Sequence, residues 1–148
     1  MERFRVLAWV GAGDDGSTGR HGAQRPGLAS FTAAMLTEGT RTRSATRISD
    51  EVGFLGASLS AGAGPDSAAL GGATLAKHLA AYLDVYADVA MNPAFPKADF
   101  DRVQDQRLVT LLQQRDQPQA IASRAFAPAF WGAHPYGCLL YTSPSPRD

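Results

Sequence analysis

The chain has 148 residues, 45% hydrophobic and 19% charged, which is enough apolar material for the core of one domain and excludes a disordered segment. Fourteen basic and fourteen acidic side chains cancel, so the composition gives no electrostatic argument for nucleic acid or an anionic membrane as a partner. The apolar runs are too short for a membrane-spanning helix, no targeting segment indicates a compartment, and the single cysteine, Cys138, excludes an internal disulfide.

The first predicted element is a strand over residues 3–10, where β-forming side chains alternate roughly with others. A polar, glycine-rich loop over residues 11–25 follows. Pro26 then begins a helix that ends at Gly39, with an apolar stripe formed by Leu28, Phe31, Met35 and Leu36. The neighbouring face of this helix carries only small side chains, namely Ser30, Ala33, Ala34 and Thr37.

A second helix is predicted over residues 44–55, with Ile48, Val52 and Leu55 on one side. Residues 57–63 and 66–74 are predicted to form an antiparallel hairpin across Gly64 and Pro65.

Three further helices are predicted, over residues 75–91, 97–114 and 118–130, before a turn at residues 134–137. The apolar positions expected on the first are Leu75, Leu79, Tyr82, Leu83, Tyr86 and Val89 or Ala90. Those expected on the second are Phe100, Val103, Leu108, Leu111 and Leu112. Because strands and helices do not alternate regularly, this order predicts an α+β domain in which helices pack on one face of an antiparallel sheet.

The usual catalytic and metal-binding side chains form no convincing cluster. His21, His78 and His134 are too far apart in sequence for a local two-histidine clamp, and each is better interpreted as a solvated, half-buried or turn residue. The glycines of residues 11–16 lack the pattern of a phosphate-binding loop. Asp99 and Asp101 open a helix, where their charge favourably meets the helix dipole.

The segment PGLASFTAAMLTEGT, residues 26–40, resembles the first-helix signature of the insulinase/pitrilysin family of zinc metallopeptidases, which includes the mitochondrial processing peptidase. The family pattern is roughly G-L-A-H-x-x-E-H-M-L-x-x-G-T, of which the chain keeps Gly27, Leu28, Ala29, Met35, Leu36, Gly39 and Thr40. LGA at residues 55–57, NPAFP at 92–96, the helix of residues 100–118 and HPYG at 134–137 match later family segments in the same order. The resemblance covers nearly all of residues 1–137 and implies the peptidase-like fold of the family.

The chain differs from active members of this family at the zinc-binding and catalytic positions. In active members, two histidines of an H-x-x-E-H motif hold zinc and the glutamate between them activates zinc-bound water. Those positions here are Ser30, Ala33 and Ala34, and the position implied for a later glutamate ligand is Thr110. Alanine offers no lone pair, and hydroxyls are poor zinc ligands beside imidazole and carboxylate. We therefore predict a catalytically inactive chain with no catalytic residue, no metal ligand and no cofactor of its own.

The resemblance implies a partner as well. Family members enclose extended peptides between homologous domains, one of which holds zinc, so we expect this chain to pair with a zinc-bearing domain or subunit. The residues that grip substrate in such partners lie beyond residue 137, and none is assigned here. The alternatives are a scaffold or assembly protein of the same fold, and an active peptidase with relocated ligands at His21, His78 or His134.

The last residues of the chain do not continue the resemblance. Residues 138–148, CLLYTSPSPRD, look like translated adapter-derived nucleotides at the end of an assembled read, and the alternative is a disordered native terminus. We therefore predict a partial peptidase-type domain over residues 1–137, incomplete at both ends, and a non-native or disordered tail over residues 138–148.

Overall fold

The computed structural model describes residues 3–11, 27–64 and 67–132. The predicted loop at residues 11–25, the turn at 134–137 and the tail at 138–148 lie almost entirely outside this part of the chain. Its elements, in chain order, are β1 (Arg3–Gly11), α2 (Leu28–Met35), η1 (Leu36–Glu38), α3 (Ala45–Phe54), β2 (Ser58–Ala63), β3 (Ser67–Leu75), η2 (Ala76–His78), α4 (Leu79–Met91), α5 (Lys97–Gln113), η3 (Gln114–Asp116) and α6 (Pro118–Trp131).

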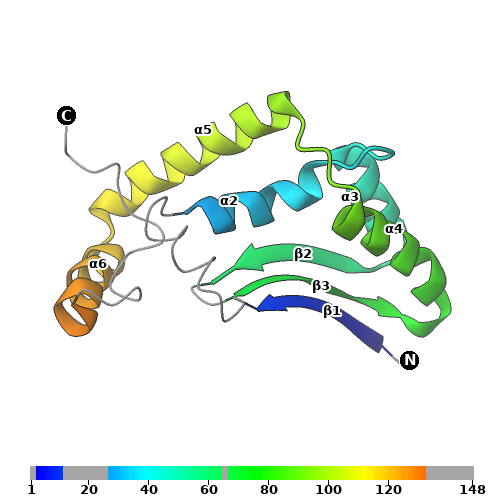
Figure 1. Cartoon of the computed structure of the whole chain (residues 1–148), viewed down its shortest axis with the longest axis horizontal. Helices are drawn as coiled ribbons and strands as arrows, with labels where there is room; N and C mark the ends of the chain where they lie inside the picture. Colours follow the sequence, from blue (N-terminus) through cyan, green and yellow to red (C-terminus); the bar gives the residue numbers. More distant parts are fainter. Residues whose placement is uncertain (1–2, 12–26, 65–66, 133–148) are drawn as a thin grey trace.

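The three strands form an antiparallel sheet in the order β1-β3-β2. The predicted hairpin of β2 and β3 is present, and β1 pairs with the other edge of β3, so that Gly72 lies between Val6 and Leu59. Helices α2, α3, α4 and α5 lie on the same side of this sheet, with α2 between the sheet and α5 (Figure 1). The predicted α+β architecture is therefore confirmed.

The core lies between the sheet and helices α3 and α4. Tyr82 and Val89 are fully buried on α4, and they pack with Ile48 and Val52 of α3. The tyrosine hydroxyls reach the sheet, where Tyr82 Oη donates to Ser58 O at 3.0 Å and Tyr86 Oη donates to Leu70 O at 2.8 Å. Both backbone acceptors thereby keep a hydrogen-bond partner inside the core.

The helix predicted from residue 75 begins later than expected. Leu75 is the last residue of β3, and α4 starts only at Leu79, after the η2 turn. The predicted apolar stripe is also wrong in one place, because Val85 is buried and Leu83 is 40% exposed. Val85 lies on the same side of α4 as the buried Tyr82, Tyr86 and Val89, whereas Leu83, two residues earlier, points to the opposite side of the helix.

A buried carboxylate, Asp88 of α4, ties this end of the molecule together. It is 7% exposed and receives hydrogen bonds from Thr40 Oγ1 at 2.7 Å, Thr42 Oγ1 at 2.7 Å, Arg43 Nη1 at 2.8 Å and Asn92 Nδ2 at 3.1 Å. Burial raises the pKa of Asp88, but these hydrogen bonds outweigh it and hold the pKa well below its usual range.

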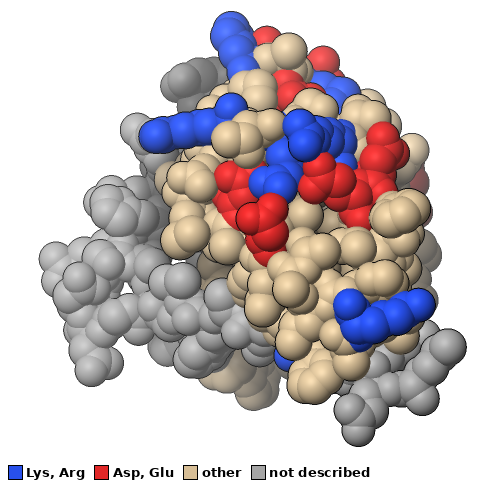
Figure 2. Space-filling model, turned by 90° about the vertical axis from the view of Figure 1, so that its right-hand side faces the viewer, with Lys and Arg blue, Asp and Glu red and all other residues tan. Residues whose placement is uncertain are grey.

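Arg43 extends this cluster to the surface. Its guanidinium also donates to Glu51 at 3.0 Å and to Asp84 at 2.5 Å, and Glu51 in turn accepts from Arg47 at 2.7 Å. Figure 2 shows the resulting interleaved basic and acidic side chains on this face. The sequence analysis did not predict this cluster.

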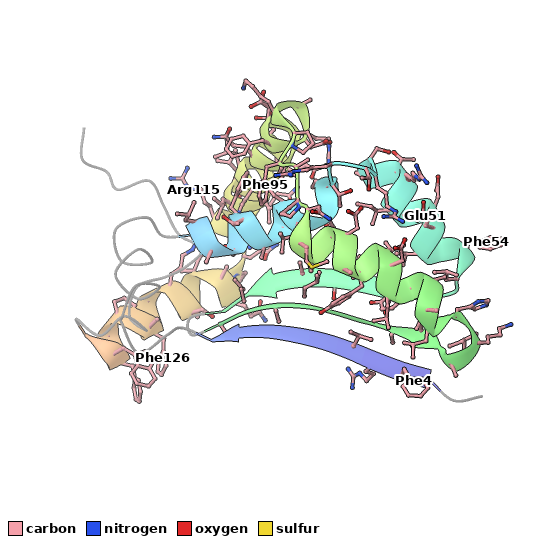
Figure 3. All side chains as sticks on the ribbon, turned by 45° about the vertical axis from the view of Figure 1, so that its right-hand side comes forward. Phe4, Glu51, Phe54, Phe95, Arg115 and Phe126 are labelled. Carbon is pink, nitrogen blue, oxygen red and sulfur yellow. The ribbon has the colours of Figure 1, made fainter. Side chains whose placement is uncertain are left out.

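The other end of the molecule is more open. Of the apolar positions predicted on α5, only Val103 is buried, whereas Leu108 and Leu112 are at least half exposed. Helix α6 has no buried residue, and Phe126 projects away from the body of the protein at 62% exposure (Figure 3). The periodicity predicted these helices correctly but not the burial of their apolar faces.

Candidate functional site

Helix α2 carries the face of small side chains that the sequence predicted. Gly27 caps the helix in the left-handed conformation, with φ of 85°, and its carbonyl accepts the first helical bond, from Phe31 N at 2.9 Å. From this start, Ser30, Ala33 and Ala34 fall on one face of the helix. Ala33 is buried, whereas Ser30 and Ala34 are half buried.

Helix α5 is held against α2 by side chains from both helices. The rings of Phe31 and Phe100 meet edge to face with centroids 4.9 Å apart, and Arg102 forms an ion pair with Glu38 of η1. The segment that follows η1 and the segment that precedes α5 are also joined, because Ala94 N donates to Gly39 O at 3.1 Å and Arg41 N donates to Asn92 O at 3.1 Å. The G-T segment at residues 39–40 and the N-P segment at residues 92–93 therefore meet in space and set the path of α5.

Between α2, α5 and the end of β2 lies a hollow of about 410 Å³, which we call the α2–α5 hollow. It brings together Ser30 and Thr110, which are far apart in the sequence, whereas Ala33 and Ala34 do not line it. Its walls are formed by Ser30, Ala61, Gly62, Ala63, Val103, Gln106, Arg107, Thr110, Leu111 and Gln114. Within the described residues, the outer edge of β2 has no neighbouring strand, so this hollow adjoins an open sheet edge.

Arg107 provides the charge of the α2–α5 hollow. Its Nη2 donates to Ser30 Oγ at 2.5 Å, and Ser30 Oγ itself donates to Gly27 O at 3.0 Å. Thr110 lies one turn further along α5 and donates to Gln106 O at 2.9 Å. Both hydroxyls are thus engaged with backbone carbonyls, and a fixed cation lies beside Ser30.

These side chains do not fit a zinc ion. Zinc sites in proteins use thiolate, imidazole or carboxylate donors, and the hollow offers hydroxyls, amides and a guanidinium. Across the described part of the chain, His, Cys, Asp and Glu side chains form no group of three or more placed to hold a metal. His78 lies in η2, beyond β3, and does not line the hollow, while His21 and His134 lie outside the described residues.

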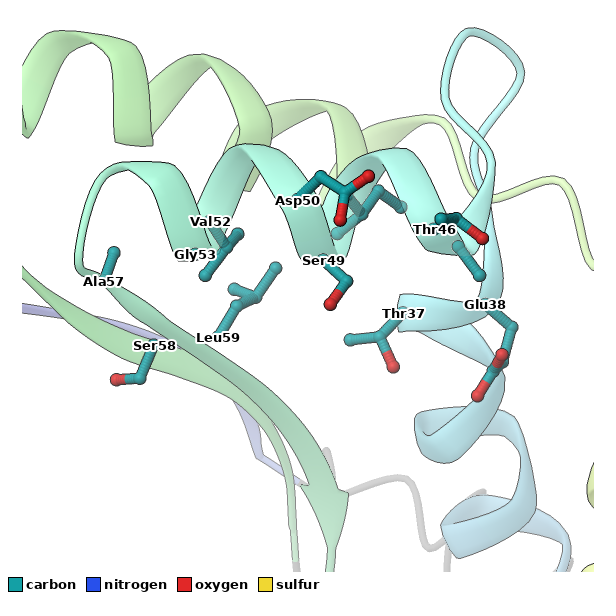
Figure 4. A pocket seen from close by; sticks show the side chains of 12 residues that line it. Thr37, Glu38, Thr46, Ser49, Asp50, Val52, Gly53, Ala57, Ser58 and Leu59 are labelled. Carbon is teal, nitrogen blue, oxygen red and sulfur yellow. The ribbon is translucent and has the colours of Figure 1, made fainter.

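A second hollow, of about 720 Å³, lies between α3, η1 and the start of β2. Thr37 and Ser49 stand on opposite walls of it (Figure 4). Its two carboxylates are Glu38, which pairs with Arg102, and Asp50. Among the described residues, no histidine, cysteine or lysine lines this second hollow.

Asp99 and Asp101 lie in the first turns of α5, as predicted. Asp99 accepts from Arg102 at 3.3 Å and Asp101 accepts from Lys97 at 3.0 Å, so both carboxylates form ion pairs on the surface of this helix.

None of the helices within residues 27–64 and 67–132 is long and apolar enough to span a membrane.

The fold identifies the class of protein. It is similar to the crystal structure of a peptidase M16 inactive domain from Pseudomonas fluorescens, with a TM-score of 0.79 and 28% sequence identity, over 91% of this chain and 32% of that one. The chain is therefore an α+β domain of peptidase type. The sequence model of the insulinase family, peptidase family M16, matches residues 14–142, and the chain belongs to this family.

Curated relatives agree with this assignment. The chain is 29% identical, over 134 residues, to uncharacterized zinc proteases of Mycobacterium bovis and Mycobacterium tuberculosis, and 28% identical to one of Mycobacterium leprae. These matches cover 89% of this chain and 29% of each relative. The chain thus spans less than a third of the length of the proteins that it resembles.

Sequence reasoning missed Arg107 and the open edge of β2. Arg107 stands one helical turn before Thr110, so the helical period places both on the same face of α5. That spacing was available in the sequence. The contact of Arg107 with Ser30 was not, because it depends on how α2 and α5 pack.

Proposed function

We propose that this chain is part of a non-catalytic domain that pairs with a zinc-bearing homologous domain or subunit and helps to enclose extended peptides. The observation that carries the proposal is the α2–α5 hollow, where Ser30 and Thr110 meet beside an arginine instead of beside zinc ligands. Ser30, Ala33, Ala34 and Thr110 are then the degenerate counterparts of a family zinc site. The likeness to a structure described as a peptidase M16 inactive domain supports the same view.

The physical contribution of such a domain is shape and backbone hydrogen bonding. The outer edge of β2 has no strand beside it within the described residues, and a peptide in extended conformation can add to such an edge. Ala61, Gly62 and Ala63 carry minimal side chains where β2 borders the hollow, which leaves the backbone accessible. Zinc and water activation would then be supplied by the partner domain alone.

Peptide cleavage by a partner with an H-x-x-E-H motif tests this proposal. Adding the full-length form of this chain is expected to raise the cleavage rate of the partner. A scaffold or assembly role predicts stable binding to the partner with no change in cleavage, and that result would overturn the proposal. An active peptidase with relocated ligands predicts cleavage by this chain alone, lost on His78→Ala.

A pair of arginine substitutions at neighbouring residues of β2 makes the test specific to the hollow. Ala63 lines the hollow on the helix-facing side of the strand, whereas a Cβ built on Gly62 lies on the opposite face and meets no atom within 4 Å. Ala63→Arg would enter the hollow and is expected to abolish the stimulation, whereas Gly62→Arg would leave it intact. Equal effects of the two variants would argue against peptide binding along β2.

A further inference from the structure

We propose that a peptide on the open edge of β2 is recognised at two side-chain positions four residues apart, one in each of the two hollows. The inference rests on the proposed peptide-enclosing function and names the class of peptide that this function selects. That class is an extended segment with apolar side chains at both positions, and the strand itself supplies the spacing between them.

The two hollows lie at the start and at the end of the same strand. Residues 57–59 line the second hollow, and residues 61–63 line the α2–α5 hollow. The middle residues of these two stretches, Ser58 and Gly62, are four positions apart, which in a strand corresponds to about 13 Å. Between them, Ser60 lines neither hollow. A peptide along this edge therefore passes both hollows in turn.

The side chains of β2 alternate between the helices and the opposite face of the sheet. Leu59 and Ala61 pack against the core between the sheet and the helices, Ala63 continues this alternation, and the residues between them are exposed. A residue directly opposite on a neighbouring strand turns its side chain to the same face. Peptide residues opposite Leu59 and Ala63 therefore both face the helices, one beside the second hollow and one beside the α2–α5 hollow.

Buried apolar side chains line each hollow. In the α2–α5 hollow these are Val103, which is buried, and Leu111, which is half buried. In the second hollow they are Ile48 and Val52, and Figure 4 shows Val52 beside Leu59 of β2, which packs against the same core. Removing apolar surface from water favours binding without a charged partner. Leucine and phenylalanine are therefore the side chains that suit both hollows, while pairing of the peptide backbone with β2 supplies the hydrogen bonds.

Fluorescence anisotropy with the full-length chain tests the spacing. Labelled dodecapeptides with blocked ends and a background of serine and threonine carry two leucines, at i and i+3, i+4 or i+5. A fourth peptide carries a single leucine. We expect the i, i+4 peptide to bind about tenfold more tightly than the other three, because an odd spacing turns one leucine away from the helices.

Substitutions assign each leucine to its hollow. Ala63→Arg places a long side chain in the α2–α5 hollow, and Ser49→Arg places one in the second hollow from an exposed position of α3. Either variant should bind the i, i+4 peptide no more tightly than the single-leucine peptide. Ser60→Arg is the matched control and should keep the wild-type preference, because Ser60 is exposed on β2 between the two hollows. Circular dichroism and thermal unfolding of each variant establish that the fold is retained.

Two results would overturn the inference. Equal binding of the three two-leucine peptides would show that apolar contact alone, without a fixed spacing, holds the peptide. A preference for the i, i+4 peptide that survives in both Ala63→Arg and Ser49→Arg would place the peptide on another surface.

The cleavage test separates this inference from the proposed function. Stimulation of the partner without a spacing preference would keep peptide enclosure and reject recognition at two positions. A spacing preference without stimulation would keep the two positions and reject the pairing with a zinc-bearing partner.

Discussion

The two ends of this domain differ in how they surround a charged side chain that is buried or half buried. At the α3–α4 end, Asp88 is surrounded by Thr40, Thr42, Arg43 and Asn92, and every described contact is internal to the fold. At the α2–α5 end, Arg107 lines an open hollow, and its guanidinium donates to Ser30 Oγ there. A closed, fully hydrogen-bonded charge stabilises the fold, whereas a charge on the wall of a hollow can meet a ligand.

The largest effect is expected from Asp88→Ala. Removing this carboxylate leaves Arg43 and two threonine hydroxyls without their shared acceptor, which should lower the free energy of unfolding by about 3 to 5 kcal/mol. Urea denaturation measures this loss in the free energy of unfolding. The matched control is Asp84→Ala, which removes an exposed partner of the same arginine and should cost about 0.5 kcal/mol or less. Similar losses in the two variants would mean that the cluster is a surface feature.

A second large effect is expected from Gly72→Ala in the middle of β3. The added Cβ would overlap the carbonyl oxygen of Ser58 and the hydroxyl of Tyr82, which are joined by a core hydrogen bond. We expect a loss of about 2 to 3 kcal/mol, measured by urea denaturation. Gly62→Ala is the control, because a Cβ at this glycine of β2 meets no atom within 4 Å. A Gly72→Ala protein as stable as Gly62→Ala would contradict the packing described here.

Acid should destabilise the fold through Asp88, at the α3–α4 end. The folded state holds the pKa of Asp88 below its unfolded value of about 3.9, so its stabilising contribution is complete above that pH and is lost as the pH falls toward the folded pKa. Unfolding free energies measured from pH 6 downward should therefore fall more steeply for the wild-type chain than for Asp88→Asn. A wild-type profile parallel to that of Asp88→Asn would exclude this linkage.

The smallest effect distinguishes two buried threonines. Thr74 Oγ1 is buried without a hydrogen-bond partner among the described residues, whereas Thr40 Oγ1 donates to Asp88. Thr74→Val should therefore raise the free energy of unfolding by about 1 kcal/mol, and Thr40→Val should lower it by about 2 kcal/mol. Differential scanning calorimetry of both variants checks the signs. A loss in Thr74→Val would show that its hydroxyl has a partner.

The sequence predicted the elements better than their contacts. The strand near the N-terminus, the hairpin and the buried Ile48 and Val52 follow from local patterns, and the structure contains them. The pairing of β1 with β3 and the bonds of Asp88 depend on residues far apart in the chain, which periodicity does not connect. Leu108 and Leu112 belong to a predicted apolar face and yet are exposed, because an apolar pattern does not show whether another element covers that face.

The candidate site was predictable in part. The small side chains on α2 were plain in the sequence, and the resemblance to the family assigned Thr110 as the position of a later ligand. The structure places Ser30 and Thr110 at the same hollow. Arg107 was not singled out, since a lone arginine on a helix is usually solvated, and only the packing of α2 against α5 shows its contact with Ser30.

Zinc stoichiometry distinguishes a non-catalytic domain from one that holds the family metal. The full-length chain is loaded with zinc, desalted and measured by plasma mass spectrometry, beside a variant that restores the family ligands through S30H, A33E, A34H and T110E, with Arg107→Leu to remove the cation. We expect no tightly bound zinc at this site in the wild-type chain and one zinc per chain in the variant. One zinc in the wild-type chain that is lost on Ser30→Ala would contradict this expectation.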